Sequence, residues 1–143
     1  MFYEKGTGAE LKKNPRLDPF KMKKTLNEET WMNSNDWLKE FPGAVTVCDK
    51  DGVILSMNAK AVQTFAADGG AALIGKNVFD CHPEPARAKL RGMMEAGRQN
   101  VYTIEKQGVK KLIYQSPWTV NGQYRGFVEL SLEIPFELPH FLR

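Results

Sequence analysis

One short stretch, Phe41 to Asn58, constrains the fold of this chain more than any other. Its sequence, FPGAVTVCDKDGVILSMN, predicts a strand, a tight turn, a second strand and the start of a helix. The segments Ala44–Asp49 and Val53–Met57 are short, apolar and rich in β-branched residues, which is typical of strands. Between them, Gly52 can adopt the positive φ that a hairpin reversal requires. Asn58 stands where the N-cap of a following helix belongs.

The segment after this hairpin predicts two helices. The first covers Ala59–Phe65, and the small, Gly-rich segment Ala66–Ala71 after it is expected to be a loop. Cys81–Pro85 predicts the entry of the second helix, because prolines in a first turn remove amide donors that have no partner there. That helix is expected over Ala86–Gln99 and ends near Gly97.

Three strands follow and complete the predicted sheet. They cover Val101–Lys106, Lys110–Val120 and Tyr124–Ile134, with turns around Gly108 and at Asn121–Gly122. With the first hairpin they give five antiparallel strands and short helices gathered on one face of the sheet. The fold class is therefore predicted to be α+β.

The chain before this region divides into two parts. A helix is predicted at about residues 28–40, because Trp31, Met32, Asn35 and Leu38 recur at helical spacing. Pro42 stops that helix. Residues 1–27 show little periodicity and are expected to be irregular. Residues 1–26 carry seven basic against three acidic side chains, a net charge of +4 within a total of +3.

The hairpin and two later motifs resemble those of PAS sensory domains. A D-x-D-G turn followed by an Asn that opens a short helix is similar to the start of a PAS domain. Gly75-Lys76-Asn77 resembles the stretch before its long ligand-side helix. The segment Gly126–Pro135 resembles the closing strand G-x-x-x-h-S-x-D-h-T, with Glu133 in place of Asp and Pro135 in place of Thr. The resemblance covers about residues 41–135.

The resemblance implies a non-enzymatic signalling protein with three parts. These are an N-terminal extension at 1–40, a PAS-like domain at 41–135 and a tail at 136–143. The expected function is a sensory module that binds a small molecule or a partner and dimerises, since PAS domains change the packing between sheet and flanking helices. Two alternatives stay open, a protein-interaction domain with a filled core and a haem-based redox or gas sensor.

The resemblance also implies which face of the last strands lines a cavity. The position of Ser131 faces the cavity in PAS domains, so period-two alternation turns Phe127 and Glu129 inward. By the same comparison, Ile113 and Gln115 face inward on the neighbouring strand. Five further residues complete the candidate pocket: Phe65, Phe79, His82, Leu90 and Met93. Such walls suit a small, mostly apolar ligand with one polar end, or else form a packed core without space.

Glu129 is the most informative ionisable residue of this candidate pocket. One interpretation is that its carboxylate recognises an amine or hydroxyl of a ligand. The alternative is a hydrogen bond to a neighbouring backbone group or to Gln115.

The opposite face of the sheet is expected to display a broad apolar patch. It comprises Leu112, Tyr114, Trp118, Val128, Leu130 and Leu132. A patch of this breadth is rarely left in contact with water. Together with Trp31, Trp37 and Leu38, it predicts a homodimer through the N-terminal helix and the outer face of the sheet.

Cofactor binding can be judged from a few positions. Cys81 and His82 are metal-binding residue types, but a site needs three or four ligands and the other histidine, His140, lies near the carboxyl end, so no metal is predicted. Haem through His82 is retained as an alternative, although His82 precedes the long helix, and a local hydrogen bond at the start of that helix explains this residue better. Light-oxygen-voltage domains carry a flavin-reactive Cys directly after the motif Asn, and Val78 in that place argues against a flavin adduct.

Composition limits the compartment and the partners. Two cysteines and no apolar segment at the N-terminus predict a reducing, cytoplasmic environment without disulfides. No stretch approaches the roughly 20 apolar residues of a membrane span. The basic residues of 1–26 could contact nucleic acid, but they lack interleaved aromatic side chains, and a solvated segment without a partner is preferred.

Overall fold

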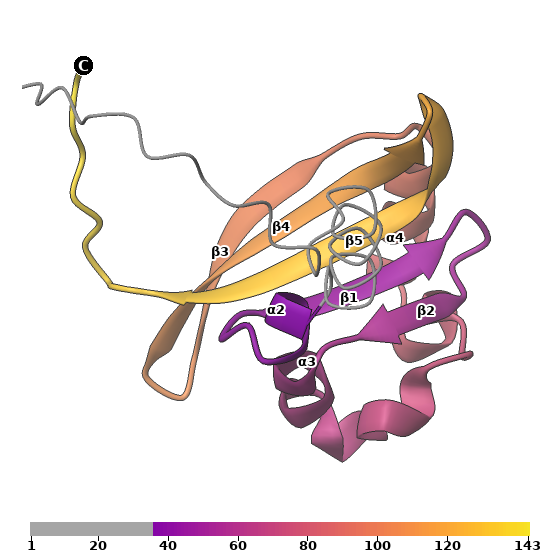
Figure 1. Ribbon diagram of the computed structural model, residues 1–143, viewed down its shortest axis with the longest axis horizontal. Helices are drawn as coiled ribbons and strands as arrows, with labels where there is room; N and C mark the ends of the chain where they lie inside the picture. The colour runs from indigo at the N-terminus through magenta and orange to yellow at the C-terminus, as the bar shows by residue number, and fades with distance from the viewer. Residues whose placement is uncertain (1–35) are drawn as a thin grey trace, which may run out of the picture. The chain divides into compact units, whose positions relative to one another are not determined.

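The computed structural model describes residues 36–143, which form one five-stranded antiparallel sheet with short helices (Figure 1). The strands are β1 (Ala44–Asp49), β2 (Ile54–Met57), β3 (Asn100–Lys106), β4 (Val109–Val120) and β5 (Gln123–Ile134). Their order across the sheet is β2-β1-β5-β4-β3, so the last strand lies in the centre beside the first. The predicted α+β class and five-stranded sheet are confirmed.

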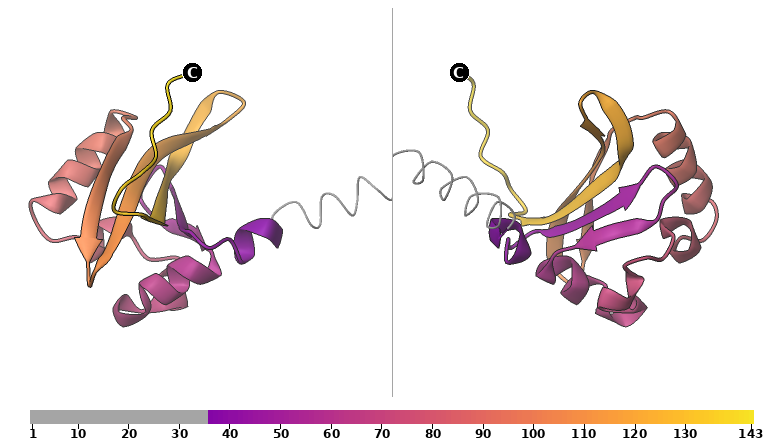
Figure 2. Two further views of the ribbon diagram at one scale, coloured as in Figure 1. Left: turned by 90° about the vertical axis from the view of Figure 1, so that its left-hand side faces the viewer. Right: turned by 45° about the vertical axis from the view of Figure 1, so that its right-hand side comes forward.

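The helical segment connects β2 to β3 and lies on one face of the sheet (Figure 2). It comprises α3 (Ala59–Thr64), the 3-10 helices η1 (Ala66–Asp68), η2 (Gly70–Leu73) and η3 (Val78–Cys81), and α4 (Ala86–Glu95). The prediction of a loop over Ala66–Ala71 is wrong, because two 3-10 turns form there on either side of Gly69, whose φ is +126°.

Helix α4 is also shorter than predicted. It ends at Glu95 rather than Gln99, because the chain reverses at Gly97, whose φ is +57°. The Gly97 and Arg98 amides then donate to the carbonyls of Met94 and Met93, at 3.2 and 3.0 Å. These bonds satisfy two of the last carbonyls of the helix.

The helix predicted at about 28–40 is described in its last part only. Helix α2 covers Asp36–Lys39, and residues 28–35 lie outside the described part of the chain. Trp37 on α2 packs edge to face against Phe41, with ring centres 6.0 Å apart. Phe41 in turn lies close to Gly43 and Leu132, at the start of β1.

The turn between β1 and β2 forms as the D-x-D-G sequence predicts. One oxygen of the Asp49 carboxylate accepts hydrogen bonds from the amides of Asp51 and Val53, both at 2.9 Å. Gly52 has a φ of +87° and is buried, which confirms the predicted positive φ. An added Cβ at Gly52 would lie 2.9 Å from both the Asn77 side-chain oxygen and the Phe79 ring.

Asn58 joins three segments through one buried side chain. Its Oδ1 accepts from the amides of Ala61 and Val45, at 2.9 and 3.0 Å, so it is the predicted N-cap of α3 and also binds β1. Its Nδ2 donates to the Gly43 carbonyl at 2.8 Å and lies 3.2 Å from that of Leu38. The connection from α2 to β1 is therefore fixed to the start of α3.

Asn77 has the same role between the hairpin turn and η3. Its Oδ1 accepts from the Phe79 amide at 3.0 Å, and its Nδ2 donates to the Asp51 carbonyl at 2.9 Å. The Val78 amide adds a bond to the Gly52 carbonyl at 2.8 Å. The segment that leads to the long helix is thereby held against the first hairpin.

The hydrophobic core lies between the sheet and α4. Cys48 and Phe127 from the sheet contact Phe79, Leu90, Met93 and Met94 from the helical segment, and all six are buried. The guanidinium of Arg91 on α4 lies 4.3 Å from the centre of the Phe79 ring, a cation–π contact. The period of α4 thus places one apolar face on the sheet.

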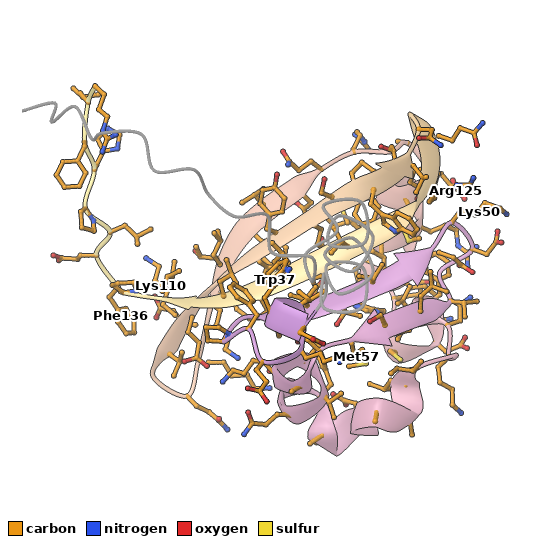
Figure 3. The ribbon with its side chains drawn as sticks, viewed as in Figure 1. Trp37, Lys50, Met57, Lys110, Arg125 and Phe136 are labelled. Atoms are coloured by element: carbon orange, nitrogen blue, oxygen red, sulfur yellow. The ribbon has the colours of Figure 1, made fainter. Side chains whose placement is uncertain are left out.

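Beyond β5 the chain continues as a tail without helix or strand. The Lys110 ammonium donates to the Phe136 carbonyl at 2.9 Å, and both residues lie at the end of β5 (Figure 3). No helix among residues 36–143 is long and apolar enough to cross a membrane.

Candidate functional site

A cavity of about 100 Å³ lies between the inner face of the sheet and the helical segment. It extends from the core to the surface, because its walls include both the buried Phe127 and the exposed Cys81. Most of its wall is apolar. The lining residues are Thr46, Cys48, Ile54, Met57, Phe65, Leu73, Val78, Cys81, His82, Leu90, Met94, Gln115, Phe127, Val128 and Glu129.

A row of polar side chains crosses four strands at one end of this cavity. Strand register places Asn100, Gln115, Glu129 and Thr46 side by side on β3, β4, β5 and β1. Adjacent strands direct paired residues to the same face of a sheet, so the row is an inner-face feature. Thr46, Gln115 and Glu129 of this row line the mostly apolar cavity and form its polar end, whereas Asn100 lies outside the lining.

Hydrogen bonds orient this row. The Asn100 amide nitrogen donates to Gln115 Oε1 at 2.9 Å, and Gln115 Nε2 donates to Glu129 Oε2 at 2.6 Å. Gln115 is buried, whereas Glu129 is half-buried. The inward orientation predicted for Glu129 is confirmed, and the alternative partner Gln115 is the one that it contacts.

The negative charge of Glu129 contributes to the raised pKa of two groups, one on each side of the row. Burial raises the pKa of the Cys48 thiol above its usual 9.0, and the nearby carboxylates of Asp49 and Glu129 raise it further. Burial, followed by the charge of Glu129, also raises the pKa of Tyr102 on β3. The polar end of the cavity is therefore an environment that disfavours further negative charge.

His82 lies at the cavity, directly after η3. Its Nδ1 is 2.7 Å from the Val78 carbonyl oxygen, so Nδ1 carries the proton and donates it. The Arg87 guanidinium donates to the His82 carbonyl at 2.9 Å and fixes the junction with α4. This is the local hydrogen bonding predicted as one explanation of His82.

The size of the cavity bears on both cofactors considered from the sequence. An apolar cavity of about 150 Å³ accommodates benzene. A haem macrocycle and a flavin ring system are each several times larger than benzene, so a cavity of about 100 Å³ would have to widen to hold either one. Val78 lies in the cavity wall, and Cys81, three residues later, lies there too.

Six of the ten predicted pocket residues line this cavity: Phe65, His82, Leu90, Gln115, Phe127 and Glu129. The other four are buried nearby. Phe79 and Met93 belong to the core cluster, where they contact other side chains instead of the cavity. Ile113 and Ser131 pair with each other on the inner face, one row further along the strands beside Ala44. A binding role for any of them stays a prediction.

Several lining residues were not predicted from the sequence. Thr46 and Cys48 alternate with Val45 and Val47 on β1, so the rule that was applied to the last strand could have identified them. Leu73 lies at the end of η2, and its place depends on the two 3-10 turns in the segment that was predicted to be a loop. No sequence pattern pointed to it.

The outer face of the sheet carries the predicted apolar patch. Register pairs Leu112 with Leu132 and Tyr114 with Leu130 across β4 and β5. Its six members are half-buried: Leu112, Tyr114, Trp118, Val128, Leu130 and Leu132. Val101 on β3 pairs with Tyr114 and extends the patch, with 48% of its surface exposed.

Comparisons with known proteins agree with this architecture. The sequence profile described as PAS fold matches residues 38–134. A search of curated proteins by sequence found no match.

Solved structures with a similar fold include three from microbial proteins. The PAS domain of an HTR-like protein from Haloarcula marismortui is 16% identical, with a TM-score of 0.54 over 80% of this chain and 99% of that one. A sensory box sensor histidine kinase from Vibrio cholerae is 15% identical, with a TM-score of 0.50 over 80% and 99%.

The third is the Aer2 receptor from Vibrio cholerae, described as a dual PAS-haem oxygen sensor. It is 19% identical, with a TM-score of 0.50 over 65% of this chain and 95% of that one. At these identities the likeness concerns the fold alone. The profile match covers more than half of the sequence, and the chain therefore belongs to the PAS fold family.

Proposed function

We propose that this chain is a sensory PAS module that binds a small molecule in the cavity and acts as a homodimer. The observation that carries the proposal is the hydrogen-bonded pair of Gln115 and Glu129 in a mostly apolar cavity wall, with Asn100 orienting Gln115 from outside the lining. A few fixed polar groups in an apolar wall are the usual composition of a small-molecule site. The expected ligand is small and mostly apolar, with one polar end.

Signalling would follow from the way the cavity is walled. Its walls come from the sheet on one side and from Phe65, η2, η3 and α4 on the other, so a ligand contacts both layers. A ligand that binds one arrangement of these layers better than another shifts their equilibrium. The outer face of the same strands would pass that shift to a second subunit.

The dimer rests on the apolar patch of the outer face. Burying one large apolar side chain contributes roughly 1.5–3 kcal/mol, so several at one interface can offset the entropic cost of association. Trp37 on α2 has 66% of its surface exposed and would supply a further aromatic contact to this interface (Figure 3). The partner proposed for this face is a second copy of the chain.

Native and denaturing mass spectrometry of the full-length protein test the ligand and the dimer together. The expected native mass is that of two 16.2 kDa chains plus a small mass that is lost on denaturation. A native mass of bare chains would contradict a resident ligand, whereas a single-chain mass would contradict the dimer.

Two substitutions on β3 test the proposed interface. Val101 on the outer face and Ile104 on the inner face are both β-branched, and 48% and 38% of their surfaces are exposed. Val101→Lys is expected to weaken the dimer in light scattering, while Ile104→Lys leaves it unchanged. A version of the chain that begins at Phe41 should also be monomeric if the N-terminal helix contributes. A full-length protein that is already monomeric would contradict the dimer, and the N-terminal helix would then pack only within its own chain.

A ligand-free interaction domain is the second candidate. The observation that favours it is the size of the cavity, about 100 Å³ against the roughly 300 Å³ at which ordinary ligand pockets begin. In that case the core is filled, and partners bind the outer face. Equal native and denatured masses per chain would favour this candidate.

A haem-based redox or gas sensor is the third candidate. It is supported by the place of His82 in the cavity wall and by the fold shared with a receptor described as a PAS-haem oxygen sensor. The size of the cavity opposes it. A visible spectrum of the purified protein decides, since bound haem absorbs strongly and a haem-free protein is colourless.

The remaining proposals concern the compartment and the ends of the chain. A reducing, cytoplasmic environment is supported by Cys48 and Cys81, both of which are free thiols. We retain as proposals the division of the chain into 1–40, 41–135 and 136–143. We also retain the proposal that the basic residues of 1–26 are solvated and bind no partner. A gel-shift assay with DNA and RNA tests the latter, and no shift is expected at physiological salt.

A further inference from the structure

The hydrogen bonds of the inner-face row define the chemistry of the polar end of the cavity. Asn100 donates to Gln115 Oε1, which leaves the amide nitrogen of Gln115 as the group directed at Glu129. An amide nitrogen donates and does not accept, so Glu129 serves there as an acceptor. The polar end is thus completed by a carboxylate rather than by a donor.

Glu129 has acceptor capacity left over. One of its oxygens, Oε2, binds Gln115, and within residues 36–143 the other oxygen makes no hydrogen bond with protein. No ion pair in this part of the chain includes Glu129, whereas Glu133, four residues later on the same face, lies 3.3 Å from the Lys60 ammonium. A half-buried carboxylate in an apolar wall is stabilised when a cation or strong donor pairs with it.

From these contacts we propose that the cavity is selective for a small alkylamine whose ammonium group binds the free oxygen of Glu129. The inference rests on the proposed small-molecule function and names the class of ligand. The alkyl part would lie against Ile54, Met57 and Leu90 in the apolar wall.

The electrostatics of the surrounding groups agree with a cationic ligand. The charge of Glu129 contributes to raising the pKa of both Cys48 and Tyr102, which face the row from β1 and β3. A carboxylate ligand placed there would be repelled by the same charge. The imidazole of His82, which also lines the cavity, is engaged with the Val78 carbonyl.

The volume of the cavity limits the length of the ligand. Benzene, with six non-hydrogen atoms, occupies an apolar cavity of about 150 Å³. By that ratio, a cavity of about 100 Å³ holds roughly four such atoms, and the ammonium group at the polar end adds one. Isobutylamine is therefore a suitable probe, and ligands of this size bind no more tightly than roughly micromolar.

The test compares three probes that share one branched four-carbon skeleton but differ in charge. Isobutylamine, isobutanol and isobutyrate are titrated separately into the full-length protein near neutral pH, with thermal unfolding and calorimetry as readouts. Isobutylamine is expected to give the largest rise in unfolding temperature, isobutanol a smaller one and isobutyrate none.

A pair of substitutions assigns the effect to Glu129. Glu129→Gln removes the charge and keeps the size, and it should lower the affinity for isobutylamine about ten- to a hundredfold, to the level of isobutanol. Glu133→Gln, on the same strand and face, is the control and should leave all three affinities unchanged. If Glu129→Gln does not fold, the order of the three affinities measured on the unsubstituted protein still tests the selectivity for amines.

The outcomes separate this inference from the proposed function. Tighter binding of isobutanol or isobutyrate would overturn the selectivity for amines and leave a small-molecule module in place. Equal loss of affinity in Glu133→Gln would overturn the role of Glu129. If none of the three probes binds at tens of millimolar, the inference is wrong, and the native mass measurement then decides the proposed function independently.

Discussion

The two sides of the sheet are stabilised in different ways. At the β1–β2 side, the strands are short, and three polar side chains, Asp49, Asn58 and Asn77, bind backbone groups of neighbouring segments. At the β3–β4 side, two long strands pair along most of their length, β4 with β5 over residues 110–120. Strand β3 forms the edge of the sheet and pairs with β4 alone. Exposed apolar residues such as Val101 and Ile104 lie along it.

The difference follows from strand length. A strand of four residues such as β2 contributes few ladder hydrogen bonds, so bonds from side chains must fix its turns. A ladder of eleven paired residues holds its strands through the backbone and leaves their side chains available for other contacts. The β1–β2 side is therefore expected to respond strongly to single substitutions and the β3–β4 side weakly.

The largest effect is expected at Asn58. Asn58→Ala removes the N-cap of α3 and leaves the buried carbonyl of Gly43 and amide of Val45 without their partners. The loss of the cap and of these buried bonds should lower the free energy of unfolding by about 3–4 kcal/mol. Chemical denaturation measures it.

Asn58→Asp is the matched control, since it keeps the acceptor for Ala61 and Val45 but cannot donate to the carbonyls of Leu38 and Gly43. It should recover part of the loss. An Asn58→Ala protein as stable as the unsubstituted one would contradict the importance of this junction.

The next largest effect compares a glycine on each side of the sheet. Gly52 and Gly108 have φ values of +87° and +75°, so valine is strained at either position. At Gly52 an added Cβ also meets Asn77 and Phe79, whereas nothing lies within 4 Å at Gly108. Gly52→Val should therefore cost about 2–3 kcal/mol and Gly108→Val clearly less. Equal unfolding temperatures of the two variants would contradict the predicted difference in sensitivity between the two sides.

The same contrast explains how much could be predicted from the sequence. The turn at Gly52 and the cap at Asn58 depend on neighbours within a few residues, so their residue types predict them. The inward orientation of Glu129 followed from period-two alternation once the face of Ser131 was assigned by resemblance. All of these expectations are confirmed.

Other features depend on packing between distant segments. Met93 and Phe79 were predicted to line the pocket, but a sequence pattern cannot tell whether an inward side chain lines a space or fills it. Leu73 reaches the cavity because Gly69 and Gly70 take positive φ in a segment whose composition is typical of loops. The boundaries of the cavity were therefore predictable only in part.

A smaller effect is expected from a bond that joins the two sides. The Trp118 indole on β4 donates to the Cys48 carbonyl on β1 at 2.9 Å, passing over β5 at Gly126. A Cβ at Gly126 would overlap that carbonyl oxygen. Trp118→Phe keeps an aromatic ring and loses the bond, so the free energy of unfolding should fall by about 1 kcal/mol. Trp118→Ala should cost more because it removes the ring, and a Trp118→Phe variant without any loss would contradict a bond between the sides.

The smallest effect is expected at alkaline pH, where the thiol of Cys48 on β1 and the hydroxyl of Tyr102 on β3 titrate. Burial and the charge of Glu129 raise the pKa of both above their usual 9.0 and 10.0. The unfolded chain therefore loses these protons first, and the free energy of unfolding should fall as the pH rises above about 9.

The variant Cys48→Ala tests which side of the sheet dominates this fall. It removes the thiol on the β1 side, so the decline of stability just above pH 9 should become shallower, while the part above pH 10 due to Tyr102 remains. Cys81→Ala is the control, because Cys81 is exposed. Denaturation series between pH 8 and 11 measure the slopes. A Cys48→Ala slope identical to that of the unsubstituted protein would show that the buried thiol is not the group that titrates.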